Sequence, residues 1–186
     1  MRDLYTMPST NHRNQPIDTF NVLFLCTFNA SRSIMAEAIL NHLGKGRFCA
    51  MSAGDQAVGQ IHPMALAILS EHGVPTTTLK SKSWATFFGL AAPRLDFIII
   101  VCDDSHEEMV LPLAQQPIKA FWPTPNPVTG NGNGNETELR AAFETLYVSL
   151  ESRIRKLLEL PMGELTRAQL WQQLMEIGRV LSIGRY

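Results

Sequence analysis

Short apolar segments alternate with amphipathic ones along most of the chain. Four segments have the length and apolar character of strands: residues 20–25, 47–52, 96–101 and 118–122. In the third of them, Phe97, three isoleucines and Val101 follow one another without interruption. A continuous apolar run of this length is typical of a strand that is buried on both faces of a parallel sheet.

The segments between these strands have helical periodicity. The clearest helix is predicted over 139–157, where Leu139, Phe143, Leu146, Leu150, Ile154 and Leu157 form one stripe. Shorter helices are predicted over 33–43, 63–72 and 81–88. A last helix is predicted from Thr166, with Gln169 completing a capping box. This alternation predicts an α/β domain whose parallel sheet is covered by helices on both faces.

The order of these segments indicates one domain with an addition at each end. Residues 1–18 are polar and irregular and are predicted to be a flexible tail. Residues 19–162 are predicted to form the α/β domain, and 163–186 a C-terminal helical extension packed on it. The proline-rich segment 123–127 fits neither a helix nor a central strand. Residues 130–135 alternate glycine and asparagine, which is typical of a flexible loop.

Composition and charge exclude several classes of function. The formal net charge is -1, so no overall basic field attracts nucleic acid. No apolar run reaches the ~18 residues of a membrane span, and no apolar signal segment follows Arg2 and Asp3. The histidines are scattered, without zinc-ligand spacing, so no metal site is expected. The three cysteines, Cys26, Cys49 and Cys102, suit a reducing compartment, and we expect a cytoplasmic protein.

The segment from Cys26 to Arg32 carries the candidate chemistry. It has the pattern Cys-x5-Arg and connects a predicted strand to a predicted helix, where α/β sheets bind their ligands. Loop amides and a helix N-terminus direct partial positive charge into such a loop, and Arg32 adds a two-pronged contact for a tetrahedral oxyanion. The same field favours the thiolate of Cys26, the nucleophilic form. Asn29 suits a backbone position of positive φ. The expected oxyanion-binding residues are Thr27, Phe28, Asn29, Ala30, Ser31 and Arg32.

Each candidate also has a simpler interpretation. Cys26 can be a buried thiol at a strand end and Arg32 a solvated helix residue, because Cys-x5-Arg alone also occurs by chance. The strand–loop–helix context favours the active-site interpretation. Cys102 ends the third strand and can be an inert core thiol. Cys49 is predicted to be a core residue.

Longer motifs extend the similarity beyond this loop. Residues 22–40, VLFLCTFNASRSIMAEAIL, resemble the arsenate reductases that use the low-molecular-weight tyrosine phosphatase fold. Similar motifs follow in order: Ser52-Ala53-Gly54, His62-Pro63, Ser81-Lys82-Ser83-Trp84, Val101-Cys102-Asp103, Trp122, Pro125 and Pro127. Together they are far more specific than Cys-x5-Arg alone.

The resemblance implies a three-layer α/β fold with a four-stranded parallel sheet flanked by helices. It implies that Cys26 attacks arsenate and that Cys102 then attacks Cys26 and releases arsenite. No bound cofactor is implied, and the electrons are expected from an external thiol reductant, either glutathione with glutaredoxin or thioredoxin. Ser33, Glu37 and Ser52 are expected to support the loop by hydrogen bonds, although Glu37 fits a plain surface helix position equally well.

The chain departs from the family pattern at several positions. Phe28 stands where a small or polar residue is common, Ala30 replaces a serine, and Phe121 replaces a histidine. Residues 109–111 contain no third cysteine. A three-thiol relay to thioredoxin therefore cannot operate, whereas an internal disulfide with Cys102 or a mixed disulfide with glutathione is still open.

Asn126 stands at the position of the family's general acid. An asparagine cannot donate a proton, and losing a general acid costs ~10² to 10⁴ in rate. The loss affects a phosphatase most, because a phenolate leaving group needs the proton. Asp103, Asp104 or His106 are candidate substitutes, but each also fits a solvated loop.

Three functions follow as hypotheses. The first is thiol-dependent reduction of arsenate, and the second is hydrolysis of phosphotyrosine or small phosphate esters through a phosphocysteine. The third is a catalytically weakened oxyanion-binding relative. Cys102 favours the first, Asn126 weakens the second, and intact Cys26 and Arg32 count against the third. The expected partners are an arsenate- or phosphate-type oxyanion and a redoxin or small thiol, with neither nucleic acid nor membrane.

Overall fold

The computed structural model describes residues 19–87, 92–102, 116–128 and 135–180. The predicted N-terminal tail and most of the glycine–asparagine loop therefore lie outside the described residues. The three candidate substitutes for the general acid, Asp103, Asp104 and His106, also lie outside them.

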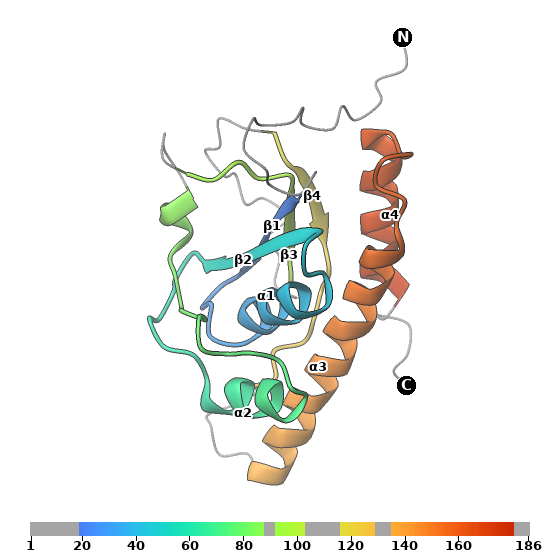
Figure 1. Ribbon diagram of the computed structural model, residues 1–186. Coiled ribbons are helices and arrows are strands. Elements are labelled where there is room, and N and C mark those ends of the chain that lie inside the picture. The colour runs from blue at the N-terminus through green and yellow to red at the C-terminus, as the bar shows by residue number, and fades with distance from the viewer. Residues whose placement is uncertain (1–18, 88–91, 103–115, 129–134, 181–186) are drawn as a thin grey trace.

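The described part of the chain is built on one parallel sheet of four strands (Figure 1). The strands are β1 (Phe20–Cys26), β2 (Phe48–Gly54), β3 (Phe97–Ile100) and β4 (Ile118–Phe121), in the order β2-β1-β3-β4. All four predicted strands are present, and β1 lies in the centre between β2 and β3. This position brings the carboxyl end of β1 beside the ends of both neighbouring strands.

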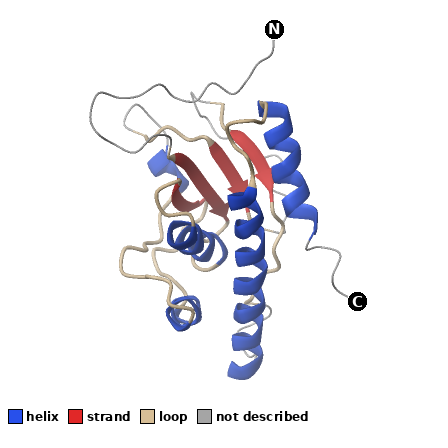
Figure 2. Ribbon diagram, turned by 45° about the vertical axis from the view of Figure 1, so that its right-hand side comes forward, coloured by secondary structure: helices blue, strands red, loops and turns tan. Residues whose placement is uncertain are grey.

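Helices flank this sheet, as the alternating pattern predicts (Figure 2). They are α1 (Arg32–Leu43), α2 (Pro63–Glu71), α3 (Glu136–Glu159) and α4 (Arg167–Val180), with the 3-10 turn η1 (Trp84–Phe87). The capping box is formed, since Gln169 Oε1 accepts from both the backbone and the hydroxyl of Thr166, each at 2.9 Å. The two C-terminal helices, α3 and α4, lie side by side in both views.

Two predictions about local structure are wrong. The helix predicted over 81–88 is only the single turn η1, because Gly54 donates to the carbonyl of Lys82 at 3.0 Å and holds residues 81–83 extended beside β2. Cys49 is exposed, not in the core. It lies on the edge strand β2 between two buried residues, and successive side chains of a strand point to opposite faces.

Trp122 joins the sheet to α4. It follows β4 and is fully buried, with its ring centroid 6.1 Å from that of Phe24. Its Nε1 donates to the carbonyl of Leu174 on α4 at 2.9 Å. The indole N–H is thereby satisfied although the ring has left water, so this contact fixes α4 against the end of β4.

We predict that Gly178→Ala destabilises the protein by roughly 1–3 kcal/mol. Alanine ordinarily stabilises a helix by about 1 kcal/mol relative to glycine. At Gly178, however, a Cβ would lie 2.0 Å from the carbonyl oxygen of Phe121 and 2.9 Å from Trp122. Urea denaturation measures the difference, with Gln172→Ala at an exposed position of the same helix as the control. A stabilised Gly178→Ala variant would show that α4 does not pack on this strand end.

Candidate active site

Cys26 is the last residue of β1, and its side chain is 3% exposed. The loop after it, 27–31, leads directly into α1, which begins at Arg32. The predicted arrangement of strand, loop and helix is therefore present. Asn29 lies in the middle of the loop with φ 45°, in the left-handed region that asparagine tolerates better than most residues.

The loop backbone is held from outside by the segment 55–62. The carbonyls of Thr27, Phe28 and Ala30 accept hydrogen bonds from three amides of this segment, at 2.9–3.2 Å. In a trans peptide the N–H points away from the C=O. The amides that follow these three carbonyls therefore point away from 55–62, and successive amides turned in this way can bind an anion.

Two neighbours of Cys26 form a hydrogen-bonded chain with it. Its Sγ lies 2.9 Å from the hydroxyl of Ser33, and that hydroxyl accepts from Asn29 Nδ2 at 2.8 Å. A hydroxyl has one proton and two lone pairs, so either Ser33 or the Cys26 thiol can donate in this contact. When Cys26 is a thiolate, the Ser33 proton is available to its sulfur.

The amide of Asn29 also ties the loop to β2. Its Nδ2 donates to Ser52 Oγ at 2.9 Å, and its Oδ1 accepts from the backbone N–H of Lys82 at 2.6 Å. Ser52 Oγ in turn donates to Glu37 at 2.5 Å, and Lys82 Nζ lies 3.2 Å from the same carboxylate oxygen. Glu37 is 8% exposed, so it is not the plain surface residue that its sequence position also allowed.

Close packing at Gly54 keeps this loop against the sheet. Gly54 lies opposite Cys26 in the pairing of β1 with β2. A Cβ on Gly54 would lie 2.5 Å from the carbonyl oxygen of Thr27 and 2.9 Å from the nitrogen of Asn29. Only glycine therefore fits between β2 and the loop, which explains the Ser-Ala-Gly motif at the end of β2.

Arg32 is 4% exposed and its Nη1 donates to the carbonyl of Thr124 at 3.1 Å. Thr124 belongs to the proline-rich segment after β4, which brings Asn126 to the same cavity as Cys26. The cavity has a volume of about 400 Å³. It is lined by Cys26, Phe28, Ala30, Ser31, Arg32, Val58, His62, Asn126 and Val128.

Cys102 lies at the end of the strand next to Cys26. It follows β3, which pairs with β1, and it is 4% exposed. The amide of Val101 donates to the carbonyl of Leu25 at 2.9 Å, so the chain continues beside β1 beyond the last paired residue of β3. Both cysteines are free thiols in the structure.

Two residues that line the cavity, Val58 and Val128, were missed in the sequence. Val58 and the expected loop residue Phe28 are exposed at its edge, 55% and 45%, and the amide of Val58 donates to the backbone carbonyl of Phe28 at 3.2 Å. Val128 follows the proline-rich segment. Nothing in the hydrophobic pattern marks either valine, because the wall forms only when the loops of separate strands meet. His62, by contrast, belongs to a quoted motif that was given no role.

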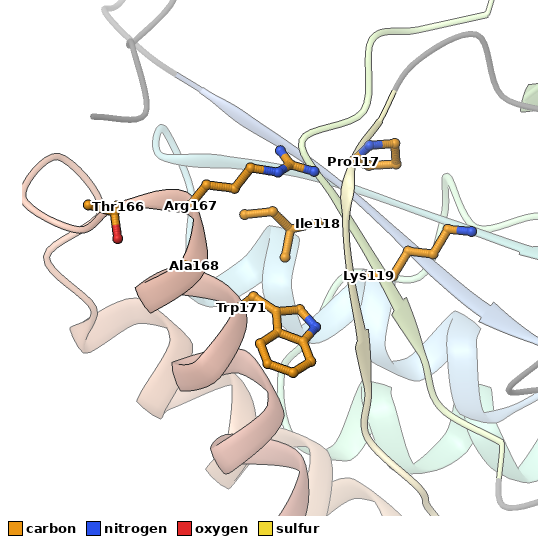
Figure 3. A pocket seen from close by; sticks show the side chains of 7 residues that line it. All are labelled: Pro117, Ile118, Lys119, Thr166, Arg167, Ala168 and Trp171. Atoms are coloured by element: carbon orange, nitrogen blue, oxygen red, sulfur yellow. The ribbon is translucent and has the colours of Figure 1, made fainter. Parts of the chain in front are cut away.

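A larger cavity of about 670 Å³ lies between the start of β4 and the start of α4 (Figure 3). Trp171 and Ile118 form its apolar wall, and Arg167 extends across it. The labelled lining residues include neither a thiol nor a carboxylate, so this cavity offers no nucleophile comparable to Cys26.

Comparison with known proteins identifies the family to which this fold belongs. Residues 21–169 match the low molecular weight phosphotyrosine protein phosphatase family. The chain belongs to this family. A glutaredoxin arsenate reductase of Synechocystis is 32% identical over 81 residues, which are 44% of this chain and 59% of that protein. An arsenate reductase of Shouchella clausii is 27% identical over 74% of this chain and 94% of its own length. The crystal structure of an arsenate reductase from Archaeoglobus fulgidus has a TM-score of 0.57 and 27% identity, covering 75% of this chain and 99% of that one.

In the described part of the chain, no three histidine, cysteine, aspartate or glutamate side chains lie close enough together to hold a metal ion. None of the described helices has both the length and the apolar character required to cross a membrane.

We predict that His62 makes stability fall with acidification. Burial lowers the pKa of His62 below its ordinary value. Its ring stacks on Phe143 at 4.8 Å, and its Nδ1 accepts from the amide of Met64 at the start of α2 at 3.1 Å. Below about pH 6.5 the unfolded chain takes up a proton that the folded chain resists, so stability is lost as pH falls through that value. NMR titration of the ring measures this pKa.

The matched variants are His62→Asn and His62→Ala. Asparagine keeps a side-chain acceptor for the start of α2, so it should remove this pH dependence without the loss of about 1 kcal/mol that alanine causes at a cap. A His62 ring that titrates above its ordinary value would contradict the prediction.

Proposed function

We propose that this protein reduces arsenate to arsenite, with Cys26 as the nucleophile and thiols as the source of electrons. The observation that carries the proposal is the position of Cys26, 2.9 Å from the Ser33 hydroxyl and in the same cavity as Arg32. The names of the relatives support arsenate as the oxyanion. The Cys-x5-Arg loop and its supporting residues Ser33, Glu37 and Ser52 are assigned to binding and orientation.

In the first step the Cys26 thiolate attacks the arsenic atom. An S–As bond forms, and one oxygen leaves as water after taking up protons. Arg32 and the loop amides balance the charge of the remaining oxygens. The residues assigned to these contacts are Thr27, Phe28, Asn29, Ala30, Ser31 and Arg32. The hydrogen bond between Ser33 and Cys26 keeps the sulfur oriented.

In the second step Cys102 attacks the sulfur of Cys26. The S–As bond breaks, its electron pair stays on arsenic, and arsenate is thereby reduced to arsenite. The two thiols are oxidised to a disulfide. The neighbouring positions of β1 and β3 support this role for Cys102. An external thiol then reduces the disulfide. The names of the relatives include a glutaredoxin arsenate reductase and a thioredoxin-dependent arsenate reductase, so they support a redoxin of either kind.

The alternative activity is phosphate-ester hydrolysis through a phosphocysteine, and membership of the phosphatase family favours it. Asn126 argues against it, because this side chain faces the cavity and has no proton to give. Its Oδ1 instead accepts from the amide of Val128 at 3.3 Å. A catalytically weakened oxyanion-binding protein is the third candidate, which loss of both activities would favour.

The direct test is arsenite production by three cysteine variants, with glutathione plus glutaredoxin or with thioredoxin. Cys26→Ser should abolish turnover, because serine is a far weaker nucleophile at neutral pH. Cys102→Ser should stop turnover after a single attack, unless glutathione replaces Cys102. Cys49→Ser is the matched control and should behave as the parent protein. Cys49 is exposed and lies near the start of the edge strand β2, whereas Cys26 lies at the carboxyl end of β1. Normal arsenite production by Cys26→Ser would refute the proposal.

We predict that Asn126→Asp raises aryl phosphatase activity more than arsenate reduction. An aspartic acid in this cavity can protonate a phenolate leaving group, an effect worth ~10² to 10⁴ in rate for a general acid. Arsenate exchanges its oxygens more readily than a phosphate ester, so attack by Cys26 on arsenate needs less help from an acid. The later attack by Cys102 is not accelerated by an acid at position 126. Turnover of an aryl phosphate and of arsenate by both variants measures the difference. Unchanged aryl phosphate turnover in a folded variant would show that position 126 is not the acid position.

A further inference from the structure

The proline-rich segment after β4 forms one side of the candidate site. Its Thr124 carbonyl accepts the hydrogen bond from Arg32, and two positions further on Asn126 faces the cavity. Trp122 makes the last sheet-type backbone hydrogen bond among the described residues, from its amide to the carbonyl of Ile100 at 2.8 Å. Within the described part of the chain, the backbone around Thr124 is held by side chains.

Arg153 of α3 supplies these contacts. Its guanidinium donates to the carbonyls of Trp122 at 3.1 Å and Pro123 at 2.9 Å, and to the hydroxyl of Thr124 at 2.7 Å. A fourth hydrogen bond, at 3.3 Å, goes to the carbonyl of Gly178 on α4. Three of the four contacts thus fall on three successive residues, Trp122, Pro123 and Thr124, where the chain enters the proline-rich segment.

The burial of Arg153 is unusual for a charged side chain. It is 2% exposed, and none of the partners described for it is a carboxylate. Its Nε has no hydrogen-bond partner among the described residues. Burial lowers the pKa of Arg153 to about 10, so the guanidinium is still charged at neutral pH. A buried charge without an ion-pair partner disfavours folding, which makes simple packing a poor explanation for an arginine here.

Two guanidinium groups therefore meet on one threonine. Arg153 binds the hydroxyl of Thr124, and Arg32 binds its carbonyl. The Thr124 hydroxyl donates to the carbonyl of Trp122 at 2.8 Å, so both its proton and its lone pair are used. Rotation of the Thr124 backbone would break these bonds together and would remove the acceptor that orients Arg32.

We propose that Arg153 is a positioning residue of the oxyanion site, which holds Thr124 so that its carbonyl orients Arg32 toward the bound anion. The inference rests on the proposed function only in taking Arg32 as an oxyanion contact. It also gives α4 a part in the site, because the Gly178 carbonyl is one of the four acceptors. Most of α4 lies beyond residue 169, where the match to the phosphatase family ends.

The test measures how inorganic phosphate protects Cys26 from alkylation by iodoacetamide, followed by mass spectrometry of the Cys26 peptide. The exposed Cys49 in the same sample is the internal reference. Arg153→Met and Thr124→Val should each raise the half-protecting phosphate concentration about tenfold, because misplacing a binding group by a fraction of a bond length is costly. Thr124→Ser, which keeps the hydroxyl, should recover most of what Thr124→Val loses. Arg155→Met, at an exposed position two residues away, should leave protection unchanged.

A double-mutant cycle separates positioning from general destabilisation. If Arg153 acts through Arg32, then Arg153→Met should cause no further loss of phosphate protection in an Arg32→Lys background. A purely structural effect would instead weaken both backgrounds equally, and that result would overturn the inference. Phosphate protection equal to the parent's in Arg153→Met, or in Thr124→Val if Arg153→Met does not fold, would also overturn it. If phosphate does not protect the parent protein at all, the oxyanion site itself is wrong and the proposed function fails with it.

Discussion

The left-handed backbone of Asn29 and the three hydrogen bonds of its side chain form the constraint on which the site depends. The amide contacts Ser33 and Ser52 through its nitrogen and the backbone of Lys82 through its oxygen. The same residue therefore turns the loop, supports the hydroxyl beside Cys26 and ties the loop to β2. A residue without a carboxamide would remove the donor that both buried hydroxyls share, and a residue that resists positive φ would not form the turn. The orientation of the sulfur follows from these contacts.

Arg32 connects this loop to the opposite wall of the cavity. On one side it is the first residue of α1, and on the other it donates to Thr124. The loop wall is held by neutral hydrogen bonds and the Glu37–Lys82 pair, whereas the proline-rich wall is held by the buried guanidinium of Arg153. The difference has a physical reason. Prolines remove backbone donors from the second wall, so its carbonyls need donors from a side chain that reaches across from α3.

Under the proposed function, two positions in this frame distinguish reductase from phosphatase chemistry. Asn126 faces the cavity where a proton donor would assist ester cleavage, and Cys102 ends the strand beside Cys26. Reduction of arsenate needs a second thiol more than it needs a strong acid, and hydrolysis of an aryl ester needs the reverse. One fold can thus support either activity, according to the side chains placed at the edge of its oxyanion loop.

Local sequence patterns were enough to predict the strands, most helices and the loop from Cys26 to Arg32, because each depends on the spacing of apolar residues or on contacts within a few positions. It did not determine that Cys49 is exposed, since an edge strand and a central strand have the same local pattern. Nor did it decide whether Glu37 faces solvent or the loop. The role of Arg153 depends on contacts 25 to 31 positions away, and that of Thr124 on Arg32, 92 positions away. Only the tertiary structure brings these residues together, because a buried cation is stable there only where carbonyls from separate elements converge.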